Sequence, residues 1–161
     1  MRIVEFLKKF DADYTIEEGR PLLGAREIGA HRYFGGVDIA RTTVVRADEK
    51  RYMCVAPLDY TIDMNMLRQA LGAVRIERVD ENEMRRIFPS CQSGAEPPFG
   101  ALYGLPTLMD ASMEADQYIA FQGETYDRAI IMTMAEYKRL ASPRIFSFAY
   151  PAMAGVYGDL R

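Results

Sequence analysis

Hydrophobic positions near the N-terminus follow the period of a helix. Four apolar residues recur at the i, i+3, i+4 and i+7 spacing that places them on one helix face. They are Ile3, Phe6, Leu7 and Phe10. This pattern predicts a first helix that ends near Asp11 and buries this apolar face. A short strand is expected at residues 14–16 and a second helix over residues 24–32, after which Gly35-Gly36 interrupts the chain.

From residue 37 onward the pattern becomes that of extended chain. β-branched and apolar residues dominate the stretches 37–45 and 51–56, and the polar residues 47–50 between them predict a hairpin. Later apolar stretches predict further strands and one more helix. The strands are expected at residues 73–79, 107–109, 117–121 and 129–132, and the helix at residues 135–140.

Two helices between these strands are marked by capping residues. Asp63 precedes an apolar helical stripe that ends at Gly72. Asp80, with Glu83 three positions later, resembles a capping box for a helix that ends at Pro89. Because helices and strands mix without strict βαβ alternation, the pattern predicts a single α+β domain with a mixed, mostly antiparallel sheet flanked by helices.

Composition narrows the functional class. The chain has 161 residues, enough for one domain with a full core, and its net charge of −3 argues against a protein that coats nucleic acid through overall electrostatics. Local recognition of a nucleic-acid end stays open. Cys54 and Cys91 form no CxxC pair, and the N-terminus carries too many charges for a signal peptide, so we expect a cytoplasmic protein. No apolar run approaches the length of a membrane span.

The most informative stretch is the loop Cys91-Gln-Ser-Gly94-Ala-Glu-Pro97-Pro98-Phe99-Gly100, which has neither a helical nor a strand period. Its glycines can adopt backbone angles closed to other residues, and its prolines fix their own angles. With free N–H groups on both sides of the proline pair, the loop is a candidate cradle for a carbonyl or phosphate group. The alternative interpretation is an ordinary structural turn.

Arg41 is the unusual residue of the stretch 37–45. By strand alternation it shares a face with Val37, Ile39 and Val45, so a guanidinium lies among apolar neighbours. Burial of an unpaired guanidinium is costly, which leaves two interpretations of equal weight. Arg41 is either a paired structural arginine, or it opens into a cleft toward an anionic or carbonyl-bearing ligand.

Standard catalytic sets are nearly absent. A single histidine, His31, excludes His–Cys zinc clusters and His-pair metal sites, and the sequence has no GxSxG, GxxxxGK[ST] or GxGxxG motif, so no metal or cofactor is expected. Asp110, at the end of a short strand, is the best single carboxylate, and a turn-forming role is the slightly favoured alternative. A basic cluster near the loop could meet phosphates, although such clusters are usually solvated surface. It consists of Arg75, Arg78, Arg85 and Arg86.

Several of these segments occur in an order known from one family. They are Ala25-Arg-Glu27-Ile28, Asp38-Ile39-Ala40-Arg41-Thr42-Thr43-Val44-Val45, Asp63…Leu67…Leu71-Gly72 and Cys91…Gly94-Ala-Glu-Pro97-Pro98-Phe99-Gly100. The chain thereby resembles the YbaK/prolyl-tRNA-synthetase-associated domain, a family of freestanding or synthetase-inserted aminoacyl-tRNA deacylases that are also called ProX-type or EbsC-like proteins. The resemblance covers about residues 1–140. Its most specific motif is Gly94-x-x-x-Pro98 followed by Phe99-Gly100.

This resemblance implies hydrolysis of the ester that joins a wrong amino acid to the 3′ end of a tRNA. Gly94 and Arg41 would be the catalytic positions, and Arg85 and Arg86 would contact the tRNA. The expected substrate-binding residues are Pro97, Pro98, Phe99, Gly100 and Asp110. Backbone N–H groups of the loop would hold the ester, and the terminal ribose hydroxyl or the substrate's own side chain would assist. The implied partners are the acceptor end of an aminoacyl-tRNA and, as a second candidate, an aminoacyl-tRNA synthetase, with no membrane and no DNA.

One departure from the family concerns Arg41, where a lysine is usual in a stretch resembling Ala-Lys-Thr-Val-Val. Arginine is bulkier, planar and never neutral, so positioning of a phosphate or carbonyl could survive this change, whereas proton transfer could not. The alternative function is therefore a non-catalytic aminoacyl-tRNA binding module, and a third is an unrelated small-molecule hydrolase that uses the same cleft. The aromatic tail at residues 142–161 lies outside the resemblance and is expected to pack back on the domain.

Overall fold

The computed structural model describes residues 1–19 and 37–152, so the helix expected at 24–32 and His31 lie outside the described residues. The elements are α1 (Ile3–Lys9), β1 (Thr15–Glu18), β2 (Val37–Ala47), β3 (Lys50–Pro57), β4 (Tyr60–Ile62), α3 (Met64–Leu71), β5 (Ile76–Arg78), α4 (Glu81–Ile87), β6 (Thr107–Asp110), β7 (Tyr118–Gln122), β8 (Arg128–Thr133), α5 (Met134–Ala141), β9 (Arg144–Phe146) and β10 (Ala149–Pro151). Short 3-10 helices lie at Gly100–Tyr103 and Ala111–Ala115. In these two ranges no helix is long and apolar enough to cross a membrane.

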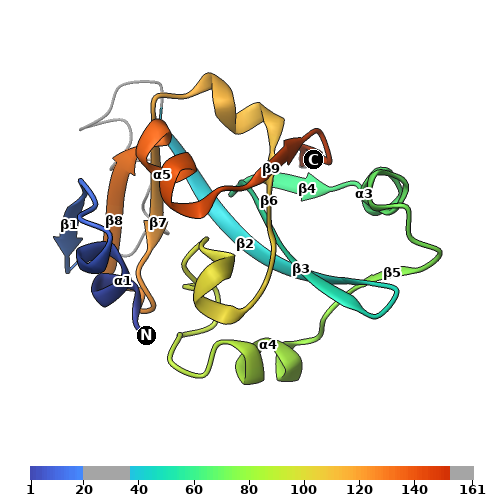
Figure 1. Ribbon diagram of the computed structural model, residues 1–161, viewed down its shortest axis with the longest axis horizontal. Coiled ribbons are helices and arrows are strands. Elements are labelled where there is room, and N and C mark those ends of the chain that lie inside the picture. The colour runs from blue at the N-terminus through green and yellow to red at the C-terminus, as the bar shows by residue number, and fades with distance from the viewer. Residues whose placement is uncertain (20–36, 153–161) are drawn as a thin grey trace, which may run out of the picture.

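The long strand β2 joins the two halves of the sheet and crosses the middle of the molecule (Figure 1). The strand order is β1-β8-β7-β2-β3-β6-β9, and β5 also pairs with β2. Pairing is antiparallel for β1 with β8, β8 with β7, β2 with β3 and β2 with β5, and parallel for β2 with β7, β3 with β6 and β6 with β9. The predicted α+β fold with a mixed, mostly antiparallel sheet is confirmed.

Helix α3 begins and ends where its capping residues predict. The Asp63 carboxylate accepts the N–H of Met66 at 2.9 Å. At the other end Gly72 adopts the left-handed conformation with φ 67°. A residue with a Cβ is strained in this conformation, so the glycine stops the helix at low cost.

Helix α4 has the predicted aspartate cap, but Glu83 does not complete a capping box. The Asp80 carboxylate accepts the N–H of Glu83 at 2.8 Å. The carboxylate of Glu83 instead pairs with Arg46 and with Arg51, whose Nε lies 2.6 Å away. Because both arginines belong to the β2–β3 hairpin, Glu83 fixes α4 to the sheet.

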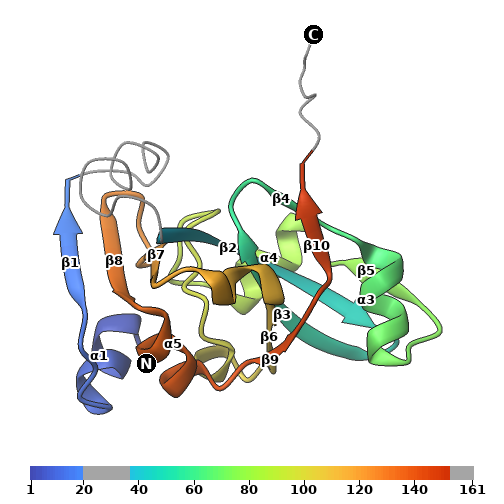
Figure 2. The same cartoon turned by 90° about the horizontal axis from the view of Figure 1, so that it is seen from above.

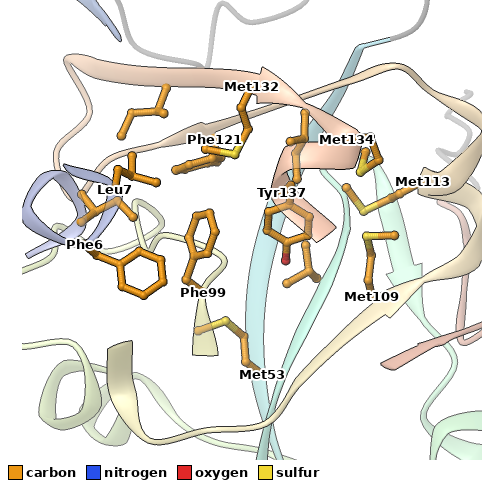
Figure 3. Packing of buried hydrophobic residues seen from close by; sticks show 14 of the residues in the cluster. Phe6, Leu7, Met53, Phe99, Met109, Met113, Phe121, Met132, Met134 and Tyr137 are labelled. Carbon is orange, nitrogen blue, oxygen red and sulfur yellow. The ribbon is translucent and has the colours of Figure 1, made fainter. Parts of the chain in front are cut away.

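The two faces of the sheet pack against different clusters. On the face of α1 and α5, which lie on the same side of β7 and β8 (Figure 2), Phe99 is surrounded by aromatic rings (Figure 3). Its ring centroid lies 5.5 Å from Phe6, 5.4 Å from Phe121 and 5.2 Å from Tyr137. The second cluster is smaller. It contains Val45, Cys54, Ala56, Ile62, Leu67, Leu108 and Phe148.

Two ends of the described chain test the sequence predictions. The apolar face of α1 is buried as predicted at Ile3, Phe6 and Leu7, but Phe10 is 46% exposed because the helix ends at Lys9. The tail packs back on the domain as expected, since β9 pairs with β6 and Phe148 is fully buried. Residues 153–161 lie outside the described part.

Candidate functional site

A cavity of about 380 Å³ opens beside β2, where residues from the strand, α4 and the glycine/proline loop meet. Its lining combines two arginines with two glutamates, small polar side chains and a few apolar ones. The lining residues are Ile39, Ala40, Arg41, Thr42, Thr43, Val44, Leu58, Arg78, Val79, Glu81, Met84, Ser93, Gly94, Glu96 and Gln122. A second cavity of about 70 Å³ shares Arg41, Thr43 and Arg78 with the first.

The cavity exists because one edge of β2 changes partner along its length. Residues Val37 to Ile39 pair with β7, and residues Val45 to Ala47 pair with β5. Between these two contacts, within the described ranges, no strand covers the edge from Arg41 to Thr43. The strand is thus paired with β3 on one side and faces the cavity on the other.

The register shows which main-chain groups face this open edge. Leu58 N–H donates to the carbonyl of Ile39 on the β3 side, whereas Val79 N–H donates to the carbonyl of Val44 on the opposite side. Since successive residues of a strand direct their N–H and C=O groups to opposite edges, Thr42 directs both of its groups toward the cavity, whereas the N–H of Ala40 faces the end of β7. Hydrogen-bonding groups of the backbone therefore line a site that also contains two cations.

The turn after β7 positions the glycine/proline loop beside this edge. Gln92 N–H donates to the carbonyl of Glu124 at 2.8 Å, and Glu124 N–H donates to the carbonyl of Ala95 at 2.9 Å. Tyr126 adds a third hydrogen bond between the two segments, because its hydroxyl donates to the Ser93 carbonyl at 2.5 Å. The sequence alone indicated nothing of this docking, which joins segments about thirty residues apart.

The structure brings Arg41 and Gly94 together on the same cavity. Gly94 is exposed and has φ 91°, a conformation that side-chain-bearing residues rarely adopt. Arg41 is also exposed, and within residues 1–19 and 37–152 its guanidinium makes no hydrogen bond or ion pair, although its main chain pairs with β3. Of the two interpretations of Arg41, the geometry favours the one in which it opens into a cleft.

The second half of the loop lies away from the cavity, so four of the residues expected to bind substrate do not line it. Pro97, Pro98, Phe99 and Gly100 are buried and absent from its lining. Phe99 is a core residue, because it fills the space among the aromatic rings of α1, β7 and α5 (Figure 3).

The N–H groups that follow the proline pair are likewise not free. Phe99 N–H donates to the Pro97 carbonyl, and Gly100 N–H donates to Thr107 Oγ1 at 2.9 Å. Glycine is required at position 100, since a Cβ there would lie 2.2 Å from the Leu105 carbonyl oxygen. These contacts favour the alternative interpretation of the proline half of the loop, that of a structural turn.

Asp110 is also a structural residue. It is 1% exposed, and its Oδ1 accepts the N–H groups of Phe148 and Ala149, both at 2.8 Å. Its Oδ2 accepts the N–H and the hydroxyl of Ser112. The carboxylate is thus occupied by the start of a 3-10 helix and by the tail, and it does not line the cavity.

The cations nearest the site differ from those expected. Arg85 and Arg86 are exposed on α4 and do not line the cavity, whereas Arg78 of β5 does. Sequence analysis grouped Arg78 with the basic cluster but could not place it on the strand that borders the open edge of β2. No spacing in the sequence indicates this location of Arg78, because it depends on the pairing of β5 with residues Val45 to Ala47.

Glu96 is the second lining residue that sequence analysis missed. It is 8% exposed, and its Oε2 accepts the N–H of Gly94 at 3.2 Å. Burial raises the pKa of this carboxyl group above its usual range. In the described part of the chain no group of three or more His, Cys, Asp or Glu residues is arranged to hold a metal ion.

Comparison with known proteins adds a family and a fold. Residues 22–140 match a family model described as an aminoacyl-tRNA editing domain. The multifunctional Ser/Thr-tRNA deacylase ProXp-y of Escherichia coli K12 is 27% identical over 97 residues, which are 60% of this chain and 58% of that protein. The match therefore spans less than two thirds of the length of this relative.

Two crystal structures share the fold at low sequence identity. The hypothetical protein APE2540 superposes with a TM-score of 0.79 and 14% identity over 93% of this chain and all of its own. A candidate trans-editing enzyme for prolyl-tRNA synthetase superposes with a TM-score of 0.71 and 16% identity over 85% of this chain and 87% of its own. At these identities the likeness concerns the fold alone.

Proposed function

Because the chain belongs to the aminoacyl-tRNA editing domain family, we propose that it is a trans-editing deacylase that hydrolyses the ester of a mischarged tRNA. Water adds to the ester carbonyl, the bond from the acyl carbon to the ribose oxygen breaks, and the products are the free amino acid and a tRNA with its terminal hydroxyl restored. The observation that carries this proposal is the meeting of Arg41, Gly94 and the open edge of β2 in one cavity.

Main-chain groups provide the donors that such a reaction needs. Ester hydrolysis passes through a tetrahedral state with negative charge on the carbonyl oxygen, which fixed N–H donors stabilise. The N–H of Thr42 faces the cavity, and Gly94 lies at its rim. The Gly94 N–H already donates to the Glu96 carboxylate. In this proposal the N–H of Thr42 therefore replaces the proline-side N–H groups, which the fold uses internally, and the terminal ribose hydroxyl assists proton transfer.

The arginines would orient the 3′ end of the tRNA. Arg41 and Arg78 border both cavities, and their charges suit the phosphates that precede the aminoacyl group. Arg85 and Arg86 lie on α4, whose residues Glu81 and Met84 line the larger cavity, and they would contact the acceptor end farther from the ester. A few local contacts of this kind are compatible with the net charge of −3.

The experiment that tests this function measures release of labelled amino acid from a panel of mischarged tRNAs. We expect wild type to release at least one amino acid, Arg41→Lys to retain or raise the rate, and Arg41→Ala to lower it by about ten- to a thousandfold, the scale for loss of one electrostatic positioning group. Lys8→Ala removes an exposed cation of α1 that lies outside the cavity and serves as the matched control.

Gel retardation of the same charged tRNAs distinguishes the alternatives. A binding module would retard a charged tRNA and release nothing with wild type, Arg41→Lys or Arg41→Ala. If only Arg41→Lys released amino acid, the compact ammonium would be indispensable and the natural protein would be a binder. Neither retardation nor release with any tRNA, in a folded protein, would reject both functions.

A further inference from the structure

Charges of opposite sign lie on different sides of the larger cavity. Arg41 and Arg78 also border the second cavity of about 70 Å³, whereas Glu81 and Glu96 border the larger one alone. The arginines belong to β2 and β5, and the glutamates belong to α4 and to the glycine/proline loop. A ligand that fits both sides therefore carries negative charge at one end and positive charge at the other.

Glu96 is the buried member of the acidic side. It lines the cavity although its residue is only 8% exposed. Its Oε2 accepts the N–H of Gly94 at 3.2 Å, and its own main-chain N–H is the second donor. A carboxylate offers about four acceptor sites, so this one keeps capacity for a ligand in the cavity.

This carboxyl group also lacks the counterion that similar residues have. The other two buried glutamates of the described chain, Glu83 and Glu124, each pair with arginine. Within residues 1–19 and 37–152, no cation pairs with Glu96. Burial and, to a lesser extent, the charge of Glu81 raise the pKa of Glu96. Both effects disfavour its ionised form, so a cation that enters the cavity would stabilise it.

We infer that Glu96 binds the α-ammonium group of the amino acid attached to the tRNA and thereby restricts the site to esters with a free amino group. This inference rests on the proposed deacylase function and limits its substrate class, because peptidyl-tRNA and other N-acylated esters lack the positive charge. In an aminoacyl-tRNA the ribose separates the α-ammonium group from the terminal phosphate. Such a 3′ end thus presents one positive and one negative group, as the two sides of the cavity require.

The same lining contains acceptors for the other N–H groups of an ammonium, which has three. The carbonyl of Thr42 faces the cavity, and the Glu81 carboxylate lies on the acidic side, where it accepts the Ser93 hydroxyl at 2.5 Å. Glu81 is exposed, so water and salt screen its attraction for a cation more than they screen that of buried Glu96. Glu96 is therefore the residue on which the preference for a charged amino group depends.

The test compares two analogues of one tRNA from the panel above, which carry a glycyl or a glycolyl group in an amide linkage that resists hydrolysis. These smallest acyl groups differ only in an ammonium group against a hydroxyl. We expect wild type to bind the glycyl analogue more tightly by roughly ten- to a hundredfold, the scale for one hydrogen bond between charged groups.

Two isosteric variants locate the source of this preference. Glu96→Gln should remove most of it by weakening the glycyl analogue alone, because the amide lacks the charge but its oxygen still accepts the N–H of Gly94. Glu49→Gln is the matched control. It removes the same charge from an exposed residue that does not line the cavity, so the ratio of the two dissociation constants should stay unchanged.

Three results would overturn the inference. Equal binding of both analogues by wild type would show that the site does not recognise the ammonium group, whatever the variants do. A preference that Glu96→Gln retains would assign the ammonium group to other acceptors, such as the Thr42 carbonyl. If Glu96→Gln slowed ester hydrolysis and left the binding ratio unchanged, Glu96 would act as a general base instead.

Because the analogues are not cleaved, this test separates the inference from the proposed function. Tighter binding of the glycyl analogue that Glu96→Gln abolishes would support the inference even if no ester were hydrolysed. Equal binding together with release of amino acid from esters would reject the inference and leave the deacylase function in place. Binding of neither analogue and release from no ester would reject both.

Discussion

Replacement of Asp110 tests whether this carboxylate supports the fold or the site. One of its oxygens holds the distant tail, and the other holds the turn that directly follows Asp110. Oδ1 accepts the N–H groups of Phe148 and Ala149, each at 2.8 Å, and Oδ2 accepts the N–H of Ser112 at 3.1 Å. Asp110→Ala would leave these donors without an acceptor, and Phe148 lies in a fully buried position.

The expected loss follows from the number of donors. An unsatisfied buried donor costs about 1–3 kcal/mol, so we expect Asp110→Ala to lower the free energy of unfolding by about 3–5 kcal/mol. Asp110→Asn retains one oxygen for Phe148 and Ala149 but directs a second donor at Ser112, and we expect a loss of about 1–2 kcal/mol. The Asp110→Ala loss comes from contacts with both the tail and Ser112, and the Asp110→Asn loss comes from the contact with Ser112; deacylation requires neither contact directly.

Urea unfolding followed by circular dichroism measures these losses. Asp63→Ala is the matched control, because Asp63 caps α3 through one exposed hydrogen bond and its removal should cost about 1 kcal/mol. Deacylation by folded Asp110→Asn should stay within a few-fold of wild type. If Asp110→Ala lost no more stability than Asp63→Ala while turnover collapsed, our assignment of Asp110 to the fold would be wrong.

Three further predictions separate the site from its scaffold. Gly94→Val should abolish deacylation and lower the free energy of unfolding by about 1–2 kcal/mol, because position 94 has a positive φ. Gly100→Ala should lower the free energy of unfolding further, because its Cβ would meet the Leu105 carbonyl. Equal stability losses in the two variants would refute this contrast. Burial raises the pKa of Cys54 to about 12 and of Cys91 to about 11, so iodoacetamide at neutral pH and the Cys→Ala variants should leave turnover within a few-fold, unless a thiolate takes part. Burial and the neighbouring Asp116 raise the pKa of Asp38 from 3.8 to about 8, so the folded state holds this proton more tightly than the unfolded state does. The stability gained from the bound proton is therefore lost as the pH rises from about 4 to about 8. Over this pH range the unfolding free energy of wild type should fall relative to that of Asp38→Asn, and a constant difference would contradict the shift.

The local elements of this protein follow from the sequence alone. The caps at Asp63 and Asp80, the stop at Gly72 and the hairpin after residue 47 lie where the residues predict them. Each depends on backbone geometry and on hydrogen bonds within a few positions of the chain, which a linear pattern contains. Strand alternation likewise placed Arg41 on a face with Val45, and the motif with Gly94 indicated the loop that reaches the cavity.

Only the tertiary structure decides which residues of the loop line the cavity and which belong to the core. Gly94 and Glu96 face the cavity, whereas Phe99 belongs to the core, although all three lie within six residues of the printed sequence. The difference arises from partners far along the chain: Tyr126 anchors the first part, and the Tyr137 hydroxyl donates to the Pro98 carbonyl across 39 positions. Asp110 became structural in the same way, through Phe148, 38 positions away. Burial and hydrogen-bond satisfaction at such residues depend on which segments the fold brings together, and no local pattern contains that information.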